Sequence, residues 1–427
     1  MKNRMHGLPP ELCVIGGGAS GLAAAIEAAR AFRQAGVPGQ VTVLERLPRV
    51  GKKLLATGNG RCNLTNRCAS PPDYFEAADF VRPALNRFSV DDTLSFFASM
   101  GLLCEEEEEG RIYPMSRQAA SVLDVLRFEA ERLGVVFHCD SRVESVQKTR
   151  DKPRFVINGS ICADAVILAC GGKASPQHGS DGSGYALLRA LQIPVAEVSP
   201  SLVQITADPK RVKSLKGMRV HAVISLYEGK KQLASQRGEI QFTEFGLSGI
   251  AAMQLSRFVS RQMEASLDLL PAFSSGEVAD YLAARVRQNP ALAAEHLLTG
   301  ILPKRVGQVL LKQAGVEPLS RPIGSLRGAE IAAISDLLKD WRFSVTGTRG
   351  FSAAQVTMGG AQRSAFDPES MEALSTPGFY AAGEVLDVDA GCGGFNLQWA
   401  WSSGRLAGES AAEKQISDYR LQTSDQG

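Results

Sequence analysis

A glycine-rich turn between an apolar run and an alanine-rich segment constrains the fold of this chain more than any other feature. The run Leu12–Ile15 predicts a buried strand, and residues 22–29, with the sequence LAAAIEAA, predict a helix. Between them stands Gly16-Gly17-Gly18-Ala19-Ser20-Gly21. A strand, a tight turn and a helix in this order are typical of a βαβ unit that binds the phosphates of a dinucleotide.

Each position of the turn has its own physical role in such a site. Gly16 makes the sharp turn, Gly18 has no Cβ and lets a pyrophosphate come close, and Gly21 lets the helix pack tightly on its strand. Ala19 and Ser20 belong to the turn that leads into the helix, whose free N–H groups and dipole favour negative charge. A lone motif of this type is a weak signal, because glycine-rich turns also occur by chance.

A second strand in the expected place strengthens the signal. Val41–Leu44 is apolar and β-branched, and Glu45 follows it directly. A carboxylate about 24 residues beyond Gly21 can accept hydrogen bonds from both hydroxyls of an adenosine ribose. The same carboxylate repels a 2′-phosphate, which argues against NADP at this site. The alternative is an ordinary βαβ unit with an exposed glutamate at the end of a strand.

Composition excludes several classes of protein. The net charge of +2 over 427 residues gives no overall field that would attract nucleic acid or anionic lipid. The eight cysteines form no C-x-x-C pair and the five histidines lie far apart, so we expect reduced thiols and no metal site. The start of the chain could imitate a signal peptide, but three glycines interrupt it and no apolar run approaches 18 residues. We therefore expect no membrane segment and a cytoplasmic location.

A long loop after Glu45 is unusually dense in glycine, asparagine and cations. It contains Arg46 and Lys53, and then the stretch Gly58-Asn59-Gly60-Arg61-Cys62-Asn63. The cations can bind phosphate, and the stretch can place amide and guanidinium donors against the polar edge of a ring. Loops of this length are uncommon without a function, and the alternative is a solvated basic loop.

The remaining first part of the chain predicts more strands and helices. A fully apolar strand over 165–168 leads through Cys170 to Gly171 and Gly172, as in a central parallel strand whose carboxyl end meets a ligand. We assign no chemistry to the acidic run 105–109. Helices are expected over 91–100, 122–133 and 185–191, and further strands over 135–138, 142–146 and 154–157.

The character of the sequence changes from Pro194. Short alternating runs suggest an antiparallel or barrel-like insert, over 202–206, 220–227, 239–242 and 265–269, and sheet-like sequence returns at 343–348 and 354–358. A helix is expected over 250–261 and several short helices over 276–341. The basic loop 210–216 reads as a solvated loop in preference to a phosphate or RNA contact. The polar tail 413–427 is expected to fray.

A second motif near the end of the chain indicates which dinucleotide binds. Residues 378–382 predict a strand that runs into Gly383, Glu384 and Asp387. A second glycine-rich stretch, 391–398, contains Gly394, Asn396 and Leu397 and precedes a helix over 399–411. This arrangement is the second half of a two-part flavin site. The acid at 384 can accept hydrogen bonds from ribityl hydroxyls, and the start of the helix at 396–398 can direct its dipole towards the pyrimidine edge of the flavin.

The sequence resembles the YhiN/BaiN-like family of NAD(P)/FAD-dependent oxidoreductases, which includes aminoacetone oxidase-type members and is similar to the flavoprotein subunits of fumarate reductase. Ala361 and Phe395 stand where valine and tyrosine are expected, and neither departure threatens flavin binding. The matching segments span nearly the whole chain: 15–22, 51–63, 110–114, 242–249, 356–360, 380–387 and 393–400.

The resemblance implies an α/β fold in which a Rossmann-like FAD-binding domain of the glutathione reductase/fumarate reductase type is interrupted by a β-barrel-like domain and a small helical domain. The expected FAD-binding parts are 1–193 and 356–427. The barrel-like insert is expected over 194–275 with a return at 342–355, and the helical domain over 276–341.

FAD is expected to bind non-covalently through residues of both motifs and of the loops that follow the strands. These residues are Gly16, Gly18, Ala19, Ser20, Gly21, Glu45, Arg46, Lys53, Gly58, Asn59, Gly60, Arg61, Val143, Cys170, Gly171, Gly172, Gly383, Glu384, Asp387, Gly394, Asn396 and Leu397. The candidates for lining the substrate side of the flavin are Arg61, Asn63, Tyr113 and Gln398.

The main functional hypothesis is an FAD-dependent oxidoreductase that transfers hydride between a small organic substrate, lying between the FAD domain and the insert, and the flavin. Only one G-x-G-x-x-G is present, so NAD(P)H would dock transiently at the flavin or oxygen would be the acceptor. Two alternatives are an RNA-modifying flavoprotein and a non-catalytic flavin sensor. The near-neutral charge, and the lack of stretches in which aromatic and basic residues alternate, make the RNA-modifying flavoprotein less favoured. A redox role for Cys62 is a further, less favoured alternative. The chain is expected to be a monomer or homodimer.

Overall fold

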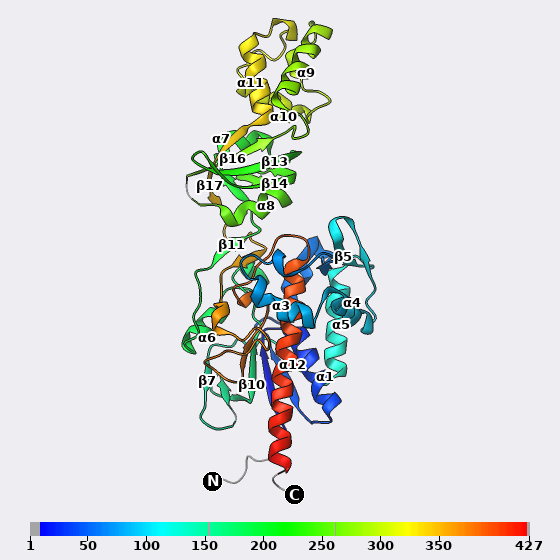
Figure 1. The fold of residues 1–427 in the computed structure, drawn as a ribbon, viewed down its shortest axis with the longest axis vertical. Helices are drawn as coiled ribbons and strands as arrows, with labels where there is room; N and C mark the ends of the chain where they lie inside the picture. Colours follow the sequence, from blue (N-terminus) through cyan, green and yellow to red (C-terminus); the bar gives the residue numbers. More distant parts are fainter. Residues whose placement is uncertain (1–8, 153, 261, 425–427) are drawn as a thin grey trace. The chain divides into compact units, whose positions relative to one another are not determined.

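The computed structural model describes residues 9–152, 154–260 and 262–424 (Figure 1). They form two compact units. One unit combines the residues up to 199 with those from 355 onward, and the other comprises residues 200–354. The first unit therefore contains both glycine-rich motifs.

A five-stranded parallel sheet forms the centre of the first unit. Its order is β19 (Phe379–Ala381), β10 (Ala165–Leu168), β1 (Glu11–Ile15), β2 (Gln40–Leu44) and β6 (Val136–His138). The prediction of a central parallel strand over 165–168 is confirmed, because β10 lies between strands from the two ends of the chain. Parallel strands meet ligands at their carboxyl ends, so the two motifs that follow β1 and β19 share one edge of the sheet.

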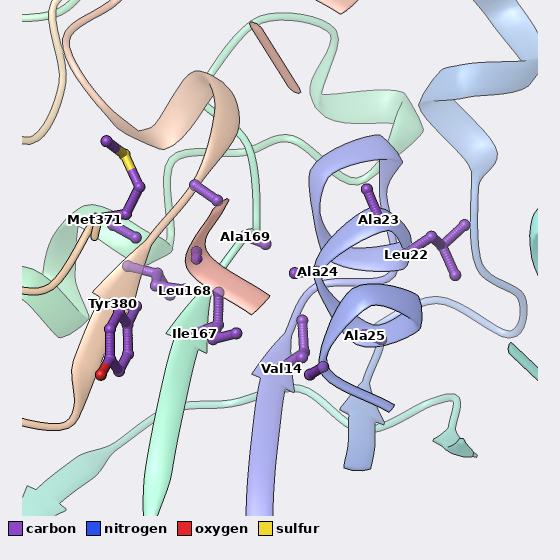
Figure 2. Packing of buried hydrophobic residues seen from close by; sticks show 14 of the residues in the cluster. Val14, Leu22, Ala23, Ala24, Ala25, Ile167, Leu168, Ala169, Met371 and Tyr380 are labelled. Atoms are coloured by element: carbon purple, nitrogen blue, oxygen red, sulfur yellow. The ribbon is translucent and has the colours of Figure 1, made fainter. Parts of the chain in front are cut away.

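The sheet is covered by α1 (Ala19–Ala35), which packs its alanine face on the strands. Val14 and Ile167 are completely buried, as are Leu22 and Ala24 of the helix (Figure 2). The small alanine side chains let the helix lie close to the sheet, which fixes its N-terminus directly above the end of β1. The predicted strand–turn–helix unit is thus confirmed.

The long C-terminal helix α12 (Phe395–Ser424) packs along α1 through glycine. A Cβ built on Gly404 would lie 2.4 Å from the backbone oxygen of Ser20, and one built on Gly408 would lie 2.2 Å from that of Ala24. No side chain fits at either position without moving a backbone. The two helices therefore approach as closely as backbones allow, and this contact joins the last part of the chain to the first.

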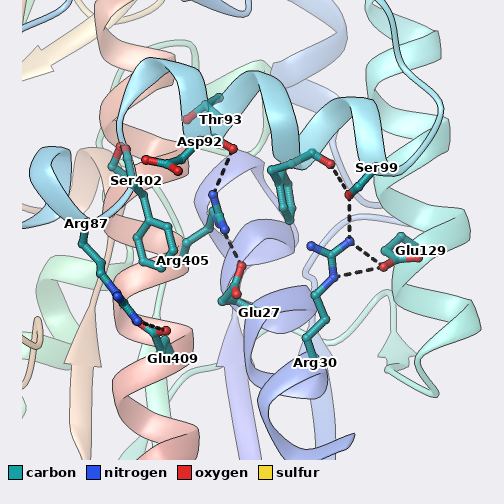
Figure 3. A network of polar contacts seen from close by, with 12 residues as sticks. Glu27, Arg30, Arg87, Asp92, Thr93, Ser99, Glu129, Ser402, Arg405 and Glu409 are labelled. Atoms are coloured by element: carbon teal, nitrogen blue, oxygen red, sulfur yellow. Dashed lines mark hydrogen bonds and ion pairs between the residues drawn. The ribbon is translucent and has the colours of Figure 1, made fainter. Parts of the chain in front are cut away.

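Charged groups reinforce this contact at its rim (Figure 3). Arg405 of α12 donates to Glu27 of α1 at 2.7 Å, and its guanidinium lies 4.0 Å from the ring centroid of Phe88. Arg30 of α1 donates to Glu129 of α5 (Ala119–Arg132) at 2.6 Å. The side chain of Arg405 is only 11% exposed, so its ion pair is less screened by water than a surface pair.

Smaller elements complete the first unit. They are α2 (Lys52–Ala56), β3 (Thr65–Asn66), α3 (Ala78–Arg87), α4 (Val90–Ser99), β4 (Cys104–Glu106), β5 (Arg111–Pro114), β7 (Val146–Lys148), β8 (Phe155–Ile157), β9 (Ile161–Ala163), α6 (Gly184–Ala190) and β18 (Val356–Met358).

The second unit is a closed barrel with helices packed on it. The strands follow the order β12 (Ile205–Ala207), β15 (Gly246–Ser248), β14 (Lys231–Phe242), β13 (Arg219–Glu228), β16 (Met263–Asp268) and β17 (Trp341–Thr348). The helices are α7 (Pro209–Val212), α8 (Ile250–Leu255), α9 (Ser275–Gln288), α10 (Lys304–Gln313) and α11 (Gly328–Lys339). One hydrophobic cluster includes barrel strands and helices alike. The fold class of an α/β unit interrupted by a barrel and a small helical part is confirmed, whereas the finer five-segment division stays a prediction.

Three local predictions are wrong. Residues 142–145 form no strand, because the Asn158 side chain bonds to the backbone of Arg142, Glu144 and Ser145 in place of a ladder partner. The helix predicted over 250–261 ends at Leu255 and is followed by a short 3₁₀ turn. Residue 261, the last of the predicted range, lies outside the described part of the chain.

The third error is the fraying tail. Residues 413–424 continue α12, because Gln415 is fully buried and Lys414 donates to Glu372 at 2.6 Å. Residues 425–427 lie outside the described residues.

The glycine contact predicts a large effect of one methyl group. We expect Gly408→Ala to lower the free energy of unfolding by about 1–3 kcal/mol, because overpacking forces two backbones apart. Chemical denaturation of the full chain measures it. Gly276→Ala is the matched control, since this helical glycine has its nearest neighbour at 4.0 Å and alanine favours a helix. A neutral Gly408→Ala would show that the two helices are not in backbone contact.

Candidate functional site

The first glycine-rich turn has the geometry that a phosphate site needs. Gly16 has a φ of +106°, and a Cβ there would lie 2.6 Å from the backbone oxygen of Ala169. Gly18 caps α1 without a side-chain hydrogen bond, and the space that its Cβ would occupy has no atom within 4 Å. The start of α1 is therefore open to a ligand exactly where its N–H groups and dipole favour an anion.

Glu45 lies against this turn at the end of β2. Its carboxylate accepts from the N–H of Gly17 at 2.9 Å and from the N–H of Leu47 at 2.9 Å. These two bonds fix the orientation of a side chain that is 9% exposed. The next residue, Arg46, forms an ion pair with Asp181. The predicted ribose-binding acid thus stands beside the predicted phosphate site.

Buried polar atoms without partners gather around the same region. Among the described residues, Arg46 Nε, His178 Nδ1, Ser180 Oγ and Tyr185 Oη have no hydrogen-bond partner. Ser180 Oγ lies 3.0 Å from the position of a Cβ on Gly171. Buried polar groups without partners are costly, and three of these four belong to residues 178–185, which fits a polar ligand that completes their bonding.

His178, Ser180 and Tyr185 were missed by sequence reasoning, whereas Arg46 was predicted as a cofactor residue. The glycine-rich stretch 179–184 directly precedes the helix predicted over 185–191, and sequence reasoning gave it no role. Its resemblance in composition to the first turn was the available signal. In the structure it brings Ser180, 3% exposed, and Tyr185, 3% exposed, beside predicted cofactor residues.

Three hydrogen bonds hold the carboxylate of Glu384 in place. Lys53 donates to its Oε2 at 2.6 Å, while the backbone N–H and the hydroxyl of Thr357 donate to its Oε1 at 3.0 and 2.8 Å. Thr357 is fully buried and its hydroxyl also accepts from the N–H groups of Lys173 and Ala174. Thr357 thus positions the carboxylate and is a second residue that sequence reasoning missed.

The two halves of the predicted site meet at Gly383. A Cβ there would lie 2.5 Å from Ser20 Oγ, and one on Gly172 would lie 2.8 Å from Glu384 Oε1. Asp387 lies close by in sequence and its backbone oxygen accepts from Arg363 at 2.9 Å. Predicted cofactor residues from three separate parts of the chain therefore lie side by side.

A second meeting point joins the loop 57–66 to the start of α12. Asn66 donates to the backbone oxygen of Gly393 at 2.9 Å, and Thr65 donates to Gln398 at 2.6 Å. A Cβ on Gly394 would lie 3.0 Å from Asn63 Oδ1, a buried atom without a partner among the described residues. The predicted Gly58–Asn63 stretch therefore lies at the N-terminus of α12.

Arg61 and Tyr113 form a pair beside this loop. The Arg61 guanidinium lies 4.4 Å from the Tyr113 ring centroid, and Glu107 holds the guanidinium at 3.3 Å. Burial raises the pKa of the Tyr113 hydroxyl, and the nearby Arg61 charge opposes that rise. Glu107 belongs to the acidic run 105–109, to which the sequence analysis assigns no chemistry, and in the structure it forms an ion pair with a predicted site residue.

Comparison with known proteins identifies the family to which this chain belongs. Residues 10–410 match the family model described as HI0933-like protein Rossmann domain. The chain belongs to the HI0933-like family. It is 40% identical to a 3-dehydro-bile acid delta(4,6)-reductase of Clostridium scindens, over 94% of this chain and 98% of that protein. It is 30% identical to a ribosomal RNA dihydrouridine synthase of Haemophilus influenzae, over 92% of this chain and 96% of that protein.

The YhiN/BaiN-like resemblance is thereby confirmed, and the chain is an FAD-dependent oxidoreductase with a Rossmann-type flavin-binding fold. Among solved structures, a 3-ketosteroid delta1-dehydrogenase from Sterolibacterium denitrificans covers 94% of this chain and 99% of its own, with a TM-score of 0.49 and 13% identity. That likeness is too low to carry an argument about this chain.

The residues of this HI0933-like chain fit FAD. The open turn at Gly18 suits the pyrophosphate, and Glu45 suits the adenosine ribose. The partnerless atoms of Ser180, Tyr185 and Asn63 offer hydrogen bonds along the path between the two halves. Which of these side chains contact bound flavin stays a prediction.

Other predicted site residues stand as follows. Gln398 is fully buried and donates to Thr93 and Ser402, so it supports the loop from behind and does not line a ligand surface. The Asn396 side chain bonds to the backbone of Ala390 and Gly391, which leaves only its backbone for a ligand.

Three predicted residues lie inside the protein. Cys62 is fully buried, and burial raises its pKa to about 12, so a thiolate is scarce at neutral pH and a thiol mechanism is disfavoured. Cys170 is partly buried and burial likewise raises its pKa to about 12. Val143 is 8% exposed on the irregular segment before β7.

Two searches of the described residues bear on other kinds of site. Over 9–152, 154–260 and 262–424, no helix has the length and apolar character needed to span a bilayer. Within those ranges no three His, Cys, Asp or Glu side chains are grouped so that they could hold a metal ion.

The partnerless tyrosine provides a test of the FAD site. We expect Tyr185→Phe to leave the stability of the apoprotein unchanged, because its hydroxyl has no partner to lose, and to weaken FAD binding about 2- to 12-fold through one lost hydrogen bond. Flavin fluorescence quenching measures the Kd and denaturation the stability. Thr357→Val is the contrasting variant and should lower both. A Tyr185→Phe variant with unchanged FAD affinity would remove Tyr185 from the site.

Proposed function

We propose that this FAD-dependent oxidoreductase reduces a carbon–carbon double bond conjugated to a carbonyl group in a small organic substrate, with NAD(P)H as the electron donor. The observation that carries the proposal is the 40% identity, over nearly the full length of both chains, to a 3-dehydro-bile acid delta(4,6)-reductase. That name describes double bonds conjugated to a ring ketone.

The second relative supports the same reaction class. Dihydrouridine is uridine whose ring double bond, conjugated to a carbonyl, has been reduced, and the synthase is 30% identical to this chain. Both names therefore describe hydrogen addition across an activated double bond. RNA modification is accordingly the second candidate function, and the two candidates differ in substrate but share the chemistry.

Arg61 and Tyr113 are the side chains that we assign to the substrate carbonyl. Flavin bound at this site, once reduced by NAD(P)H, would supply the hydride that adds to the carbon β to the carbonyl. The Arg61 guanidinium, held by Glu107, can stabilise negative charge on the carbonyl oxygen. The raised pKa of Tyr113 keeps its hydroxyl protonated at neutral pH, so it can donate a proton to the carbon α to the carbonyl, which completes the reduction.

The electron donor is inferred from the sequence. The chain has one G-x-G-x-x-G, which FAD uses, so a nicotinamide has no second Rossmann site in this chain and would dock transiently at the flavin. Oxygen as the physiological acceptor is the alternative, and it predicts an oxidase instead of a reductase.

Anaerobic single-turnover kinetics test the proposed function. We expect NADH or NADPH to bleach the bound flavin, and a steroid 3-oxo-4-ene to restore its colour with formation of the saturated ketone. A saturated 3-oxo steroid is the control and should leave the flavin reduced. Flavin that neither nicotinamide reduces, or reduced flavin that only oxygen reoxidises, would contradict the proposal.

Tyr113→Phe tests the proton donor. We expect kcat for enone reduction to fall about 10²- to 10⁴-fold, with FAD affinity unchanged, because a positioned general acid contributes that much. Because burial raises the Tyr113 pKa above its ordinary value of about 10, the wild-type kcat should show no alkaline fall due to this group below about pH 10. A variant with wild-type kcat would assign the proton to water or to another group.

A further inference from the structure

The charge of this chain is divided unevenly between its two units. Residues 200–354 carry 20 lysines and arginines against 13 aspartates and glutamates, a net charge of +7. The whole chain has 47 against 45, so the remainder carries 27 against 32, a net charge of −5. The near-neutral total therefore conceals a basic insert, and such asymmetry is typical of proteins that contact polyanions.

Part of this charge is gathered on one exposed surface of the barrel. The basic cluster consists of Lys210, Arg211, Lys213, Lys216 and Arg349, all of them exposed. Four lie on α7 and the turns that follow it, and the fifth lies just after β17.

Contacts within the barrel unit bring these cations together. Lys216 forms an ion pair with Glu244 at 2.9 Å. The pKa of Glu244 is lowered chiefly by Lys216, with further contributions from Arg349 and Lys213, so three cations face a single carboxylate. Arg211 donates to the backbone oxygen of Arg342 on β17 at 2.8 Å, which fixes α7 beside that strand. The acids of the segment, Glu244 and Asp208, do not balance the five cations.

An aromatic ring stands in the same place. The Arg349 guanidinium lies 4.0 Å from the ring centroid of Phe245, and the ring is 40% exposed. Exposed aromatic rings next to arginine are the surfaces on which unpaired bases stack. Phe245 and Arg349 are about a hundred positions apart in the sequence, so no local pattern shows this pairing.

We propose that the basic cluster together with Phe245 binds a single-stranded segment of RNA. The cations would contact the phosphates and the Phe245 ring would stack on a base. RNA fits better than an acidic protein segment, because the negative face of the exposed Phe245 ring stacks on a base but does not attract a carboxylate. This inference rests on the second candidate function, RNA modification, and identifies a surface that would bind the RNA. The sequence argued against RNA because the whole chain is nearly neutral and its aromatic and basic residues do not alternate. That argument does not apply to the folded insert, which is basic and places Phe245 beside Arg349.

Fluorescence anisotropy with a labelled 20-nucleotide single-stranded, uridine-rich RNA tests the proposal on the full-length, FAD-loaded protein. We expect Lys213→Gln/Lys216→Gln to weaken binding tenfold or more and to reduce the slope of log K against log salt by about 1–1.5. Lys230→Gln/Lys231→Gln is the matched control: it removes the same charge from the exposed β13–β14 hairpin of the same unit and should leave both quantities unchanged.

Phe245→Leu separates stacking from charge. We expect it to weaken RNA binding roughly tenfold with an unchanged salt slope. The proposal is overturned if the two lysine pairs have equal effects, or if heparin competes as well as RNA while Phe245→Leu is without effect, which would indicate a non-specific anion surface. The activity of the same variants separates this proposal from the proposed function. Enone reduction, measured on the same variants, should be unchanged.

Failure of RNA binding with intact enone reduction refutes this surface only, whereas RNA binding without any turnover refutes the proposed function only.

Discussion

The backbone contact between α1 and α12 is the constraint on which the site depends. Gly404 and Gly408 let the last helix lie against the backbone of Ser20 and Ala24, at distances that admit no methyl group. Because α1 begins at one glycine-rich turn and α12 begins at the other, their packing brings both turns to the same edge of the sheet. At the edge of this contact, Arg405 of α12 forms an ion pair with Glu27 of α1. A dinucleotide whose two parts contact the two turns can bind only when both turns are in place.

The polar side chains around these turns divide into two groups. Some are satisfied within the protein, such as Glu384 with its lysine and threonine partners, and these are already oriented before any ligand binds. Others, such as Ser180 and Tyr185, are buried without partners among the described residues. The first group gives the site its shape, and the second gives the free energy that binding can recover. Their location on one path between the two motifs is what an elongated dinucleotide requires.

Much of the fold could be predicted from the sequence because its strongest signals are local. A β-strand, a glycine-rich connection and a helix follow one another near each end of the chain, and apolar runs such as Ala165–Leu168 are readable as buried strands. Alternation predicted an antiparallel or barrel-like insert, and the family resemblance implied the barrel that the structure has. The segment 142–145 was misread because a distant asparagine, Asn158, bonds to its backbone, and the tail was misread because its polar residues pair with other elements.

The site was predicted less completely, since its missing parts depend on tertiary contacts. Thr357 lies on the short strand β18 and Ser180 in a glycine-rich loop, and only their position beside Glu384 and Gly171 gives them a role. Gln398 was placed on the ligand side from its motif, yet its amide is used up by Thr93 and Ser402. Likewise, Glu107 looked like part of a solvated acidic run until folding set it against Arg61.

The most direct test of this account is a titration of the FAD-free protein with FAD, followed by flavin absorbance and fluorescence. The account predicts one flavin bound per chain, with a shifted visible spectrum, and loss of that binding when Gly18 is replaced by valine, whose side chain would enter the open space above the first turn. A protein that stays colourless after reconstitution, or one that binds FAD equally well with valine at that position, would contradict it.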